Sequence, residues 1–182
     1  MSEFADQVRR KDRQITELSA LKELLINSIS CSIAIERGGY PLIHVAFFDY
    51  DEMNHEIIFH FSKHGHAGLE ITEGKKVCVS IYKSGKLYTA PKAVDFGCEY
   101  QSIILYGKIR IIENEEERMS AMDSFFNKFF NHIGKEDFES FTPLQARPIH
   151  IAKIKIEKWL MKEHRVPDFA LHSFYPEIDI SL

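Results

Sequence analysis

EYQSIILYGKIRII, residues 99–112, is the longest stretch of β-type sequence in this chain of 182 residues. Isoleucine, tyrosine and leucine dominate it, and β-branched and aromatic side chains are typical of strands. Gly107 lies inside the stretch, where a glycine indicates a bulge or the corner of a barrel. The sequence therefore predicts one long strand that bends near Gly107.

Shorter strand-like segments lie on both sides of this stretch. Each is rich in strand formers or alternates between apolar and polar residues, and polar turns separate them. Residues 84–96 carry a glycine and a proline and are expected to be irregular. Many short strands with few crossover helices favour a mainly antiparallel β-barrel with flanking helices. The predicted strands are residues 30–36, 42–48, 56–61, 76–82, 99–112 and 149–160.

Three helices are predicted between the strands. Residues 16–27 place leucines at helical spacing, with Thr16 as the expected N-cap. Residues 115–130 begin with three glutamates after Asn114, and acidic side chains suit the positive end of a helix. A short helix is expected at about residues 66–72. The methionine and phenylalanine stripe of the second helix is interpreted as buried core and not as a cofactor site.

Composition limits the classes of partner. The formal net charge is −4, which argues against nucleic acid because proteins that bind it usually carry a basic face. No apolar run approaches the ~20 residues that a membrane-spanning helix needs, and no signal-peptide pattern opens the chain. We therefore expect a cytoplasmic protein without membrane or nucleic-acid partners. The three cysteines have no CxxC spacing and are expected to be reduced.

Residues 62–68, SKHGHAG, form the stretch that most suggests a binding site. Together with His60, the histidines have the spacing HxxxHxH, which could hold a metal, although nothing in the sequence brings the side chains together. A small-residue loop before a helix could instead offer backbone N–H groups to a phosphate. A polar loop whose glycines only permit tight turns explains the sequence equally well. We expect no metal here and leave the other two interpretations open.

Two residues of the long strand form a second candidate site. Tyr100 and Ser102 lie two positions apart and so share one face of the strand. They could flank a planar ring and hydrogen-bond to its polar edge. A tyrosine at the rim of a barrel with its hydroxyl in water is the commoner alternative. No GxSxG motif and no paired carboxylates are present, so no catalytic residue is assigned.

Three segments carry a resemblance to a known family. RRKDRQIT at residues 9–16, KAVDFGCEYQSIILYGKIRIIEN at 92–114 and EEERMSAMDSFF at 115–126 resemble the pyridoxamine 5′-phosphate oxidase-like superfamily. The similarity is greatest to its nitroimidazole-resistance-type flavin-nucleotide-binding proteins and extends over about residues 9–160. It implies a split β-barrel, a homodimer and a flavin held between the subunits. It also implies an FMN-binding domain over residues 1–161. The strand pattern is lost in residues 162–182, which Pro167 and Pro176 interrupt, so this segment is expected to be a tail or an arm.

The resemblance also implies a set of cofactor-binding residues. One strand would contact the flavin ring through its backbone, the next strand and its loop would contact the phosphate, and the long strand would face the ring. The implied residues are Pro41, Ile43, His44, Val45, Phe61, Ser62, Lys63, His66, Ala67, Gly68, Tyr100 and Ser102.

The chain departs from the family pattern at three of these positions. Pro41 directly follows Tyr40, whereas the family's YxVP motif has its proline three residues after the tyrosine. Phe61 stands where the family has a histidine before the serine, and Gly68 stands where it has a loop lysine. The phosphate would then depend on Ser62, Lys63, His66 and backbone amides.

Three functions follow as hypotheses. The first is an FMN- or FAD-dependent oxidoreductase that acts on a small molecule, with FMN as the expected cofactor and FAD as the alternative. The second is a haem- or flavin-binding carrier or sensor without turnover. The third is a dimeric interaction module that has lost the cofactor.

Overall fold

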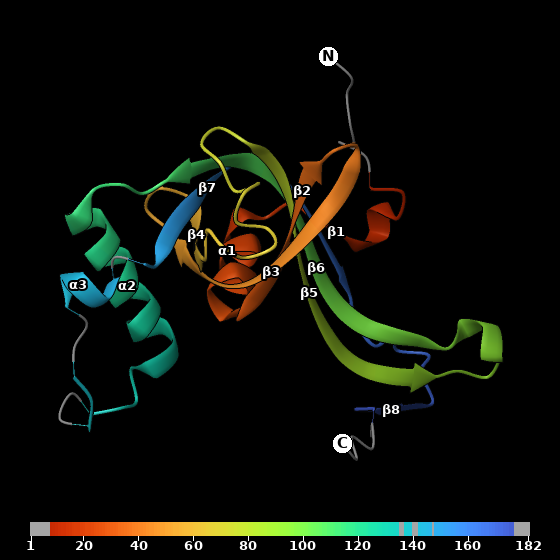
Figure 1. Ribbon diagram of the computed structural model, residues 1–182. Coiled ribbons are helices and arrows are strands. Elements are labelled where there is room, and N and C mark those ends of the chain that lie inside the picture. Colours follow the sequence, from red (N-terminus) through yellow and green to blue (C-terminus); the bar gives the residue numbers. More distant parts are fainter. Residues whose placement is uncertain (1–7, 135–136, 140–141, 147, 177–182) are drawn as a thin grey trace.

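The protein is described here by a computed structural model that covers residues 8–134, 137–139, 142–146 and 148–176 (Figure 1). Its strands pair antiparallel throughout, in the order β1-β7-β4-β3-β2-β5-β6, and β6 also pairs with β7. That last pairing closes β2 to β7 into a barrel, which confirms the predicted antiparallel split-barrel architecture. The strands are β1 Gln14–Ile15, β2 Ser30–Arg37, β3 Tyr40–Asp51, β4 Glu56–Phe61, β5 Lys76–Thr89, β6 Gly97–Ile111, β7 His150–His164 and β8 His172–Phe174.

Helices lie at the ends and on the outside of the barrel (Figure 1). The helices are α1 Leu18–Asn27, α2 Glu115–Phe130 and the short α3 Pro143–Ala146, with 3₁₀ turns at Lys11–Arg13 and Ala93–Asp95. No helix in the described ranges is long and apolar enough to span a membrane.

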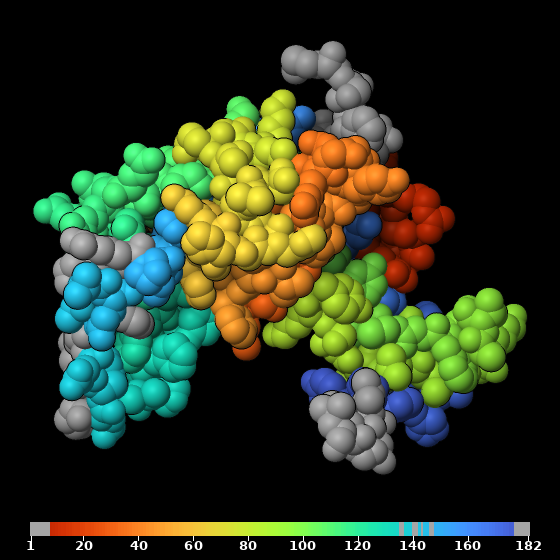
Figure 2. Space-filling view, viewed as in Figure 1, coloured from red at the N-terminus to blue at the C-terminus, as the bar shows by residue number. Residues whose placement is uncertain are grey.

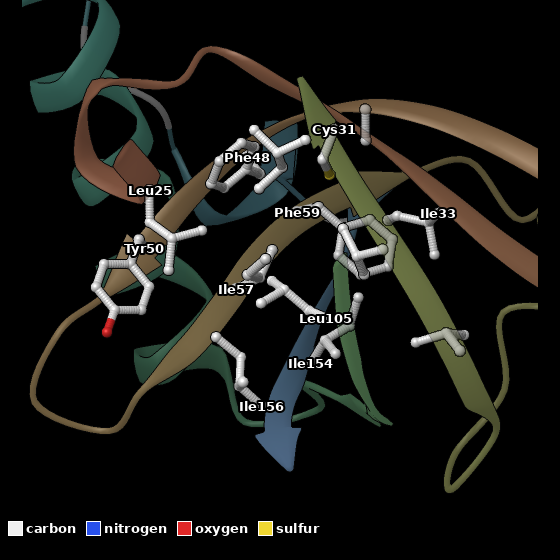
Figure 3. Close-up of a cluster of buried hydrophobic side chains, with 14 of the residues drawn as sticks. Leu25, Cys31, Ile33, Phe48, Tyr50, Ile57, Phe59, Leu105, Ile154 and Ile156 are labelled. Atoms are coloured by element: carbon white, nitrogen blue, oxygen red, sulfur yellow. The ribbon is translucent and has the colours of Figure 1, made fainter. Parts of the chain in front are cut away.

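The barrel interior is filled by side chains from alternate positions along the strands. Ile33, Phe48, Phe59 and Leu105 are fully buried there, and Leu25 of α1 joins the same cluster (Figure 3). A second, smaller cluster lies outside the barrel, where α2 covers the outer faces of β4 and β7. Helix α2 is therefore fixed to the outside of the barrel beside the ends of β3 and β4.

The first helix begins later than the sequence suggested. It starts at Leu18 with Glu17 as the N-cap, so the assignment of Thr16 as N-cap was wrong. The reason is β1, because Gln14 and Ile15 pair with β7 and keep the backbone extended up to that point. The second helix has the predicted cap, since Asn114 accepts a hydrogen bond from the Glu117 amide at 2.9 Å.

The short helix expected at residues 66–72 is absent, and that segment forms successive turns. The amides of Gly65 and Gly68 donate to Ser62 and Gly65 carbonyls, three residues back, at 3.0 and 2.9 Å. Two glycines within four residues disfavour a helix, because glycine is among the weakest helix formers. The turns close the loop on itself and leave no helix end for an anion.

The prediction that residues 84–96 are irregular was also largely wrong. Strand β5 continues to Thr89, with a register shift against β6 between Ser84 and Leu87. Gly85 permits this irregularity, after which pairing resumes. The result is a long β5–β6 hairpin that projects from the barrel and is joined by β8 (Figure 1). The last barrel strand likewise runs past the expected Leu160, to His164.

The predicted bulge at Gly107 is confirmed. The pairing of β6 with β7 shifts by one residue between Tyr106 and Gly107 of β6. Tyr106 faces Lys158 of β7, whereas Gly107 faces Ile156. The backbone approaches closely here. A Cβ on Gly107 would overlap the Lys155 carbonyl oxygen and come within 2.8 Å of Ile154 Cγ2.

Gly107→Ala should therefore lower the free energy of unfolding by about 1–3 kcal/mol, the usual cost of overpacking. Because a backbone carbonyl is the obstacle, the neighbouring strand must shift to accept the methyl group. Chemical denaturation of the variant measures the effect, with Lys108→Ala on the exposed side of the same strand as the control. Equal stability of the two variants would contradict this account of the bulge.

Candidate functional site

A cavity of ≈ 420 Å³ opens where β3 and the end of β4 meet the segment before β7. In Figure 2 the residues around and after β4, in gold and yellow, form a continuous surface with β3, in orange. The cavity has the size of ordinary small-molecule sites, which span roughly 300–1,000 Å³. Its lining residues are His44, Val45, Ala46, Phe47, His60, Phe61, Ser62, Pro148 and Ile149.

The alternation of β3 creates one wall of this cavity. Ala46 and Phe48 point into the barrel and are buried, whereas Val45 and Phe47 point outward and are 66% and 57% exposed. Large apolar side chains in a row on an exposed strand often mark a binding surface. The outer side of β3 is thus an apolar wall, and it lies beside the polar residues His60 and Ser62 at the end of β4.

Two histidines contribute the ring nitrogens of the cavity. His44 Nε2 is buried and has no hydrogen-bond partner among the described residues. The pKa of His44 is lowered by burial and further by the nearby His60, and burial also lowers the pKa of His60. Both imidazoles are therefore uncharged near neutral pH. A buried nitrogen without a partner is costly, so His44 is a natural contact for a bound molecule.

Basic side chains gather at one side of the cavity. His150 lies opposite Phe61 in the β4–β7 pairing, with the two rings 5.7 Å apart. Burial lowers the pKa of His150, and the charges of Lys63, Arg118 and His64 lower it further. Arg118 also donates to the Ile149 carbonyl at 2.8 Å, which ties α2 to the cavity wall. The positive charges of Lys63 and Arg118 near this ring favour an anionic group at the rim.

Arg118 and His150 were not identified in the sequence. Arg118 follows three glutamates in the first turns of a helix, so its charge looked like ordinary helix patterning. His150 is brought to the cavity only by the pairing of β4 with β7, which joins segments about ninety residues apart. No local signal in the sequence could have placed either residue beside the cavity.

The loop after β4 is shaped by internal contacts. Ala67 and Gly68 are buried in it, and a Cβ on Gly68 would lie 2.7 Å from the Lys63 carbonyl carbon. The His64 amide lies 3.3 Å from Ser62 Oγ, to which it donates. The amides of His64, Gly65 and Gly68 are therefore engaged in hydrogen bonds within the loop. The phosphate-cradle hypothesis needed such amides to be available to the ligand. Lys63 and His66 remain exposed on the loop.

His66 has an arginine beside it that the sequence did not indicate. Its Nε2 lies 3.4 Å from Arg37 Nη1, at the end of β2. Arg37 is also paired with Glu70 at 3.4 Å. Within the described part of the chain, no three histidine, cysteine or acidic side chains form a group able to hold a metal ion.

The remaining predicted site residues lie apart from the cavity. Pro41 and Ile43 are on β3 nearer its start, exposed and paired with β2. Tyr100 and Ser102 are on β6, where Tyr100 stacks on Tyr82 with ring centroids 6.0 Å apart. Of the predicted residues, the structure thus brings His44, Val45, Phe61 and Ser62 together in the cavity, with the loop 63–68 following on from Ser62.

Tyr100 takes part in a separate polar cluster. It lies 3.4 Å from Arg13 Nη1 and lines a cavity of ≈ 490 Å³ that also includes His164. The His164 ring in turn hydrogen-bonds to the Tyr88 hydroxyl at 2.8 Å. This cluster lies where the β5–β6 hairpin leaves the barrel.

Comparison with known proteins gives the family. A family model described as pyridoxamine 5′-phosphate oxidase matches residues 17–158, more than half of the chain. A search of curated proteins found no match.

Solved structures share the fold at low sequence identity. The flavocytochrome Anf3 from Azotobacter vinelandii has a TM-score of 0.78 at 18% identity, with 91% of this chain and 75% of that chain covered. The FAD and heme binding protein from Mycobacterium smegmatis has a TM-score of 0.75 at 20% identity, covering 86% and 76%. A candidate 5-nitroimidazole antibiotic resistance protein from Bacteroides thetaiotaomicron has a TM-score of 0.67 at 18% identity, covering 82% and 86%. With the family match over residues 17–158, the chain belongs to the pyridoxamine 5′-phosphate oxidase family.

Proposed function

We propose that this protein binds a flavin nucleotide in the cavity that β3, the end of β4 and the segment before β7 line, and uses it as an oxidoreductase of a small molecule. The observation that carries the proposal is the combination, in one cavity, of an apolar strand wall, the unpartnered His44 Nε2 and a basic rim. Such a site suits a molecule with a planar ring at one end and a phosphate at the other. A bound flavin would supply the hydride or electron chemistry, and the protein would supply binding and orientation.

Different residues would hold the two ends of the flavin. His44, Val45 and Phe61 line the apolar part and would contact the ring, with His44 offering its uncharged imidazole as a hydrogen-bond partner. Ser62 and Lys63, at the start of the loop, would contact the phosphate. Arg118 adds positive charge near His150, and the predicted His66 lies exposed on the same loop as Lys63. FMN is the expected cofactor, and FAD is the alternative.

A homodimer is part of the proposal. Ile43, Val45 and Phe47 form an exposed apolar stripe along β3, which a second copy of the chain could cover. In such a dimer Pro41 and Ile43 would lie at the subunit contact, and a partner's hairpin could bring Tyr100 and Ser102 to the flavin. We further propose that residues 162–182 act as an arm on the barrel domain of residues 1–161, and that the protein works in the cytoplasm.

A carrier or sensor of haem or flavin without turnover is the second candidate. The observation in its favour is that two imidazoles, His44 and His60, line the same cavity, and histidine is a common axial ligand of haem iron. Two proteins of the same fold are described as a flavocytochrome and as an FAD and heme binding protein.

Titration of the purified protein with FMN, FAD and haemin separates these candidates. We expect saturable binding of FMN or FAD, seen as a yellow complex with shifted flavin absorbance, and loss of affinity in His44→Ala. A Soret shift with haemin that is lost in either single variant, His44→Ala or His60→Ala, would favour the haem carrier or sensor. A protein that is colourless and takes up neither flavin would contradict the flavin proposal.

A further inference from the structure

A second cavity, of ≈ 430 Å³, lies beside the first and was not expected from the sequence. Its main wall is the apolar stripe of α2, which the sequence analysis interpreted as core. That interpretation holds for part of the stripe, since Phe125 is buried, but Phe130 is 47% exposed. The residues of α2 that line the cavity are Met122, Phe125, Phe126, Phe129 and Phe130.

Polar contacts between α2 and β3 hold this wall in place. Lys128 Nζ donates to the Phe48 carbonyl at 3.0 Å and lies 3.8 Å from an Asp49 carboxylate oxygen. Ser124 donates a hydrogen bond to the same Asp49 carboxylate. These contacts fix the distance between helix and strand. Phe129 of α2 packs against Phe47 of β3 with ring centroids 5.8 Å apart, and the aromatic side chains around this contact border a hollow.

The two cavities share a wall. Phe47 and His60 line both of them, and the His60 ring packs edge-on against Phe125 with centroids 5.4 Å apart. His60 is the one polar side chain among the described residues that line the second cavity. Burial lowers the pKa of His60, so its ring is uncharged near neutral pH and can exchange one hydrogen bond with a ligand.

We propose that the second cavity binds an uncharged, planar aromatic molecule with one hydrogen-bonding group directed at His60. Aromatic side chains favour offset or edge-on contact with another ring. A charged ligand would lose its hydration without a partner in this wall. Because the cavity shares Phe47 and His60 with the proposed flavin site, its occupant would lie next to the flavin as the substrate. This last role rests on the proposed function, whereas the binding site itself does not.

The experiment uses 1-naphthol as the probe, in calorimetric titrations of the full chain with and without FMN. Wild type should bind it saturably, and 1-naphthoate, the charged analogue, at least tenfold more weakly. Phe130→Gln removes a partly exposed wall residue and should weaken 1-naphthol binding about tenfold. Phe169→Gln is the matched control, because Phe169 is 59% exposed and lies outside this cavity. On FMN-loaded protein, 1-naphthol should also perturb the flavin absorbance.

Each other outcome overturns a stated part of the inference. Equal affinities in Phe130→Gln and Phe169→Gln, or no saturable binding by wild type, would remove the aromatic site. If Phe130→Gln instead changes the sedimentation coefficient while 1-naphthol does not bind, the wall is a subunit contact. If FMN and 1-naphthol both bind but the flavin spectrum is unchanged, the substrate role is lost. If FMN does not bind at all, the proposed function fails, while 1-naphthol binding to the unloaded protein still tests the cavity.

Discussion

Replacing Lys153 with methionine should lower the free energy of unfolding by about 3–5 kcal/mol, the usual cost of breaking a buried charge network from one side. Lys153 is 8% exposed and its Nζ lies 3.6 Å from Asp51, 3.8 Å from Glu56 and 3.1 Å from Glu117. Methionine keeps most of the side-chain volume but leaves three carboxylates close together around an apolar group. The network joins β3, β4, β7 and α2, so its loss should loosen the helix that forms the main wall of the second cavity.

Chemical denaturation at neutral pH measures this effect, and Lys108→Met is its control. Lys108 pairs with Glu157 at 2.9 Å, but both side chains are nearly half exposed. Exposed pairs contribute about 0–1 kcal/mol. Comparable losses in the two variants would show that the buried network does not stabilise the fold.

The same network predicts how stability depends on pH. The Arg110 hydrogen bonds, followed by the contact with Lys153, lower the pKa of Glu117 from 4.5 to about 2 against the opposing effect of its burial. A carboxyl whose pKa is lower in the folded state stabilises the fold above its unfolded pKa. That stabilisation is lost as pH falls from about 4.5 towards 2. Lys153→Met should therefore show its largest deficit near neutral pH and a smaller one in acid, where the carboxylates are protonated.

The barrel could be predicted because its strands carry their signal locally. Alternation in residues 30–36 and 149–160 and the long β-type run at 99–112 are visible without knowledge of the partners. Two of the errors arose at glycines. Gly85 looked like the end of a strand but permits an irregularity in the continuous β5, and Gly68 looked like part of a helix start but lies in a turn where a Cβ does not fit.

The site was predictable only in part, for a similar reason. His44, Val45, Phe61 and Ser62 lie on neighbouring strands, and the family resemblance placed them together. Arg118, in contrast, comes near His150 only because α2 folds back over β4 and β7. The second cavity depends on the spacing between α2 and β3. Hydrophobic periodicity can show which face of a helix is apolar, but it does not show whether that face is fully covered.

Lys63→Ala should weaken FMN binding about 10–100-fold and leave riboflavin binding nearly unchanged. Hydrogen bonds to charged groups contribute about 1.5–3 kcal/mol, which corresponds to that range of affinity. Riboflavin has the same ring system but no phosphate, so the difference between the two ligands isolates the phosphate contact. Lys63 is exposed on the loop after β4, and its removal should not disturb the ring part of the cavity.

Two further variants test how the charge is distributed around the phosphate. His66→Ala removes the residue that the sequence favoured. Arg118→Lys keeps a positive charge at the residue that the structure adds near His150. If Lys63 and Arg118 carry the phosphate, Arg118→Lys should retain most of the FMN affinity, and His66→Ala should change it less than Lys63→Ala does. Added salt should weaken FMN binding more than riboflavin binding, because exposed charges are screened. Equal losses of FMN and riboflavin affinity in Lys63→Ala would mean that this lysine shapes the loop and does not contact the phosphate.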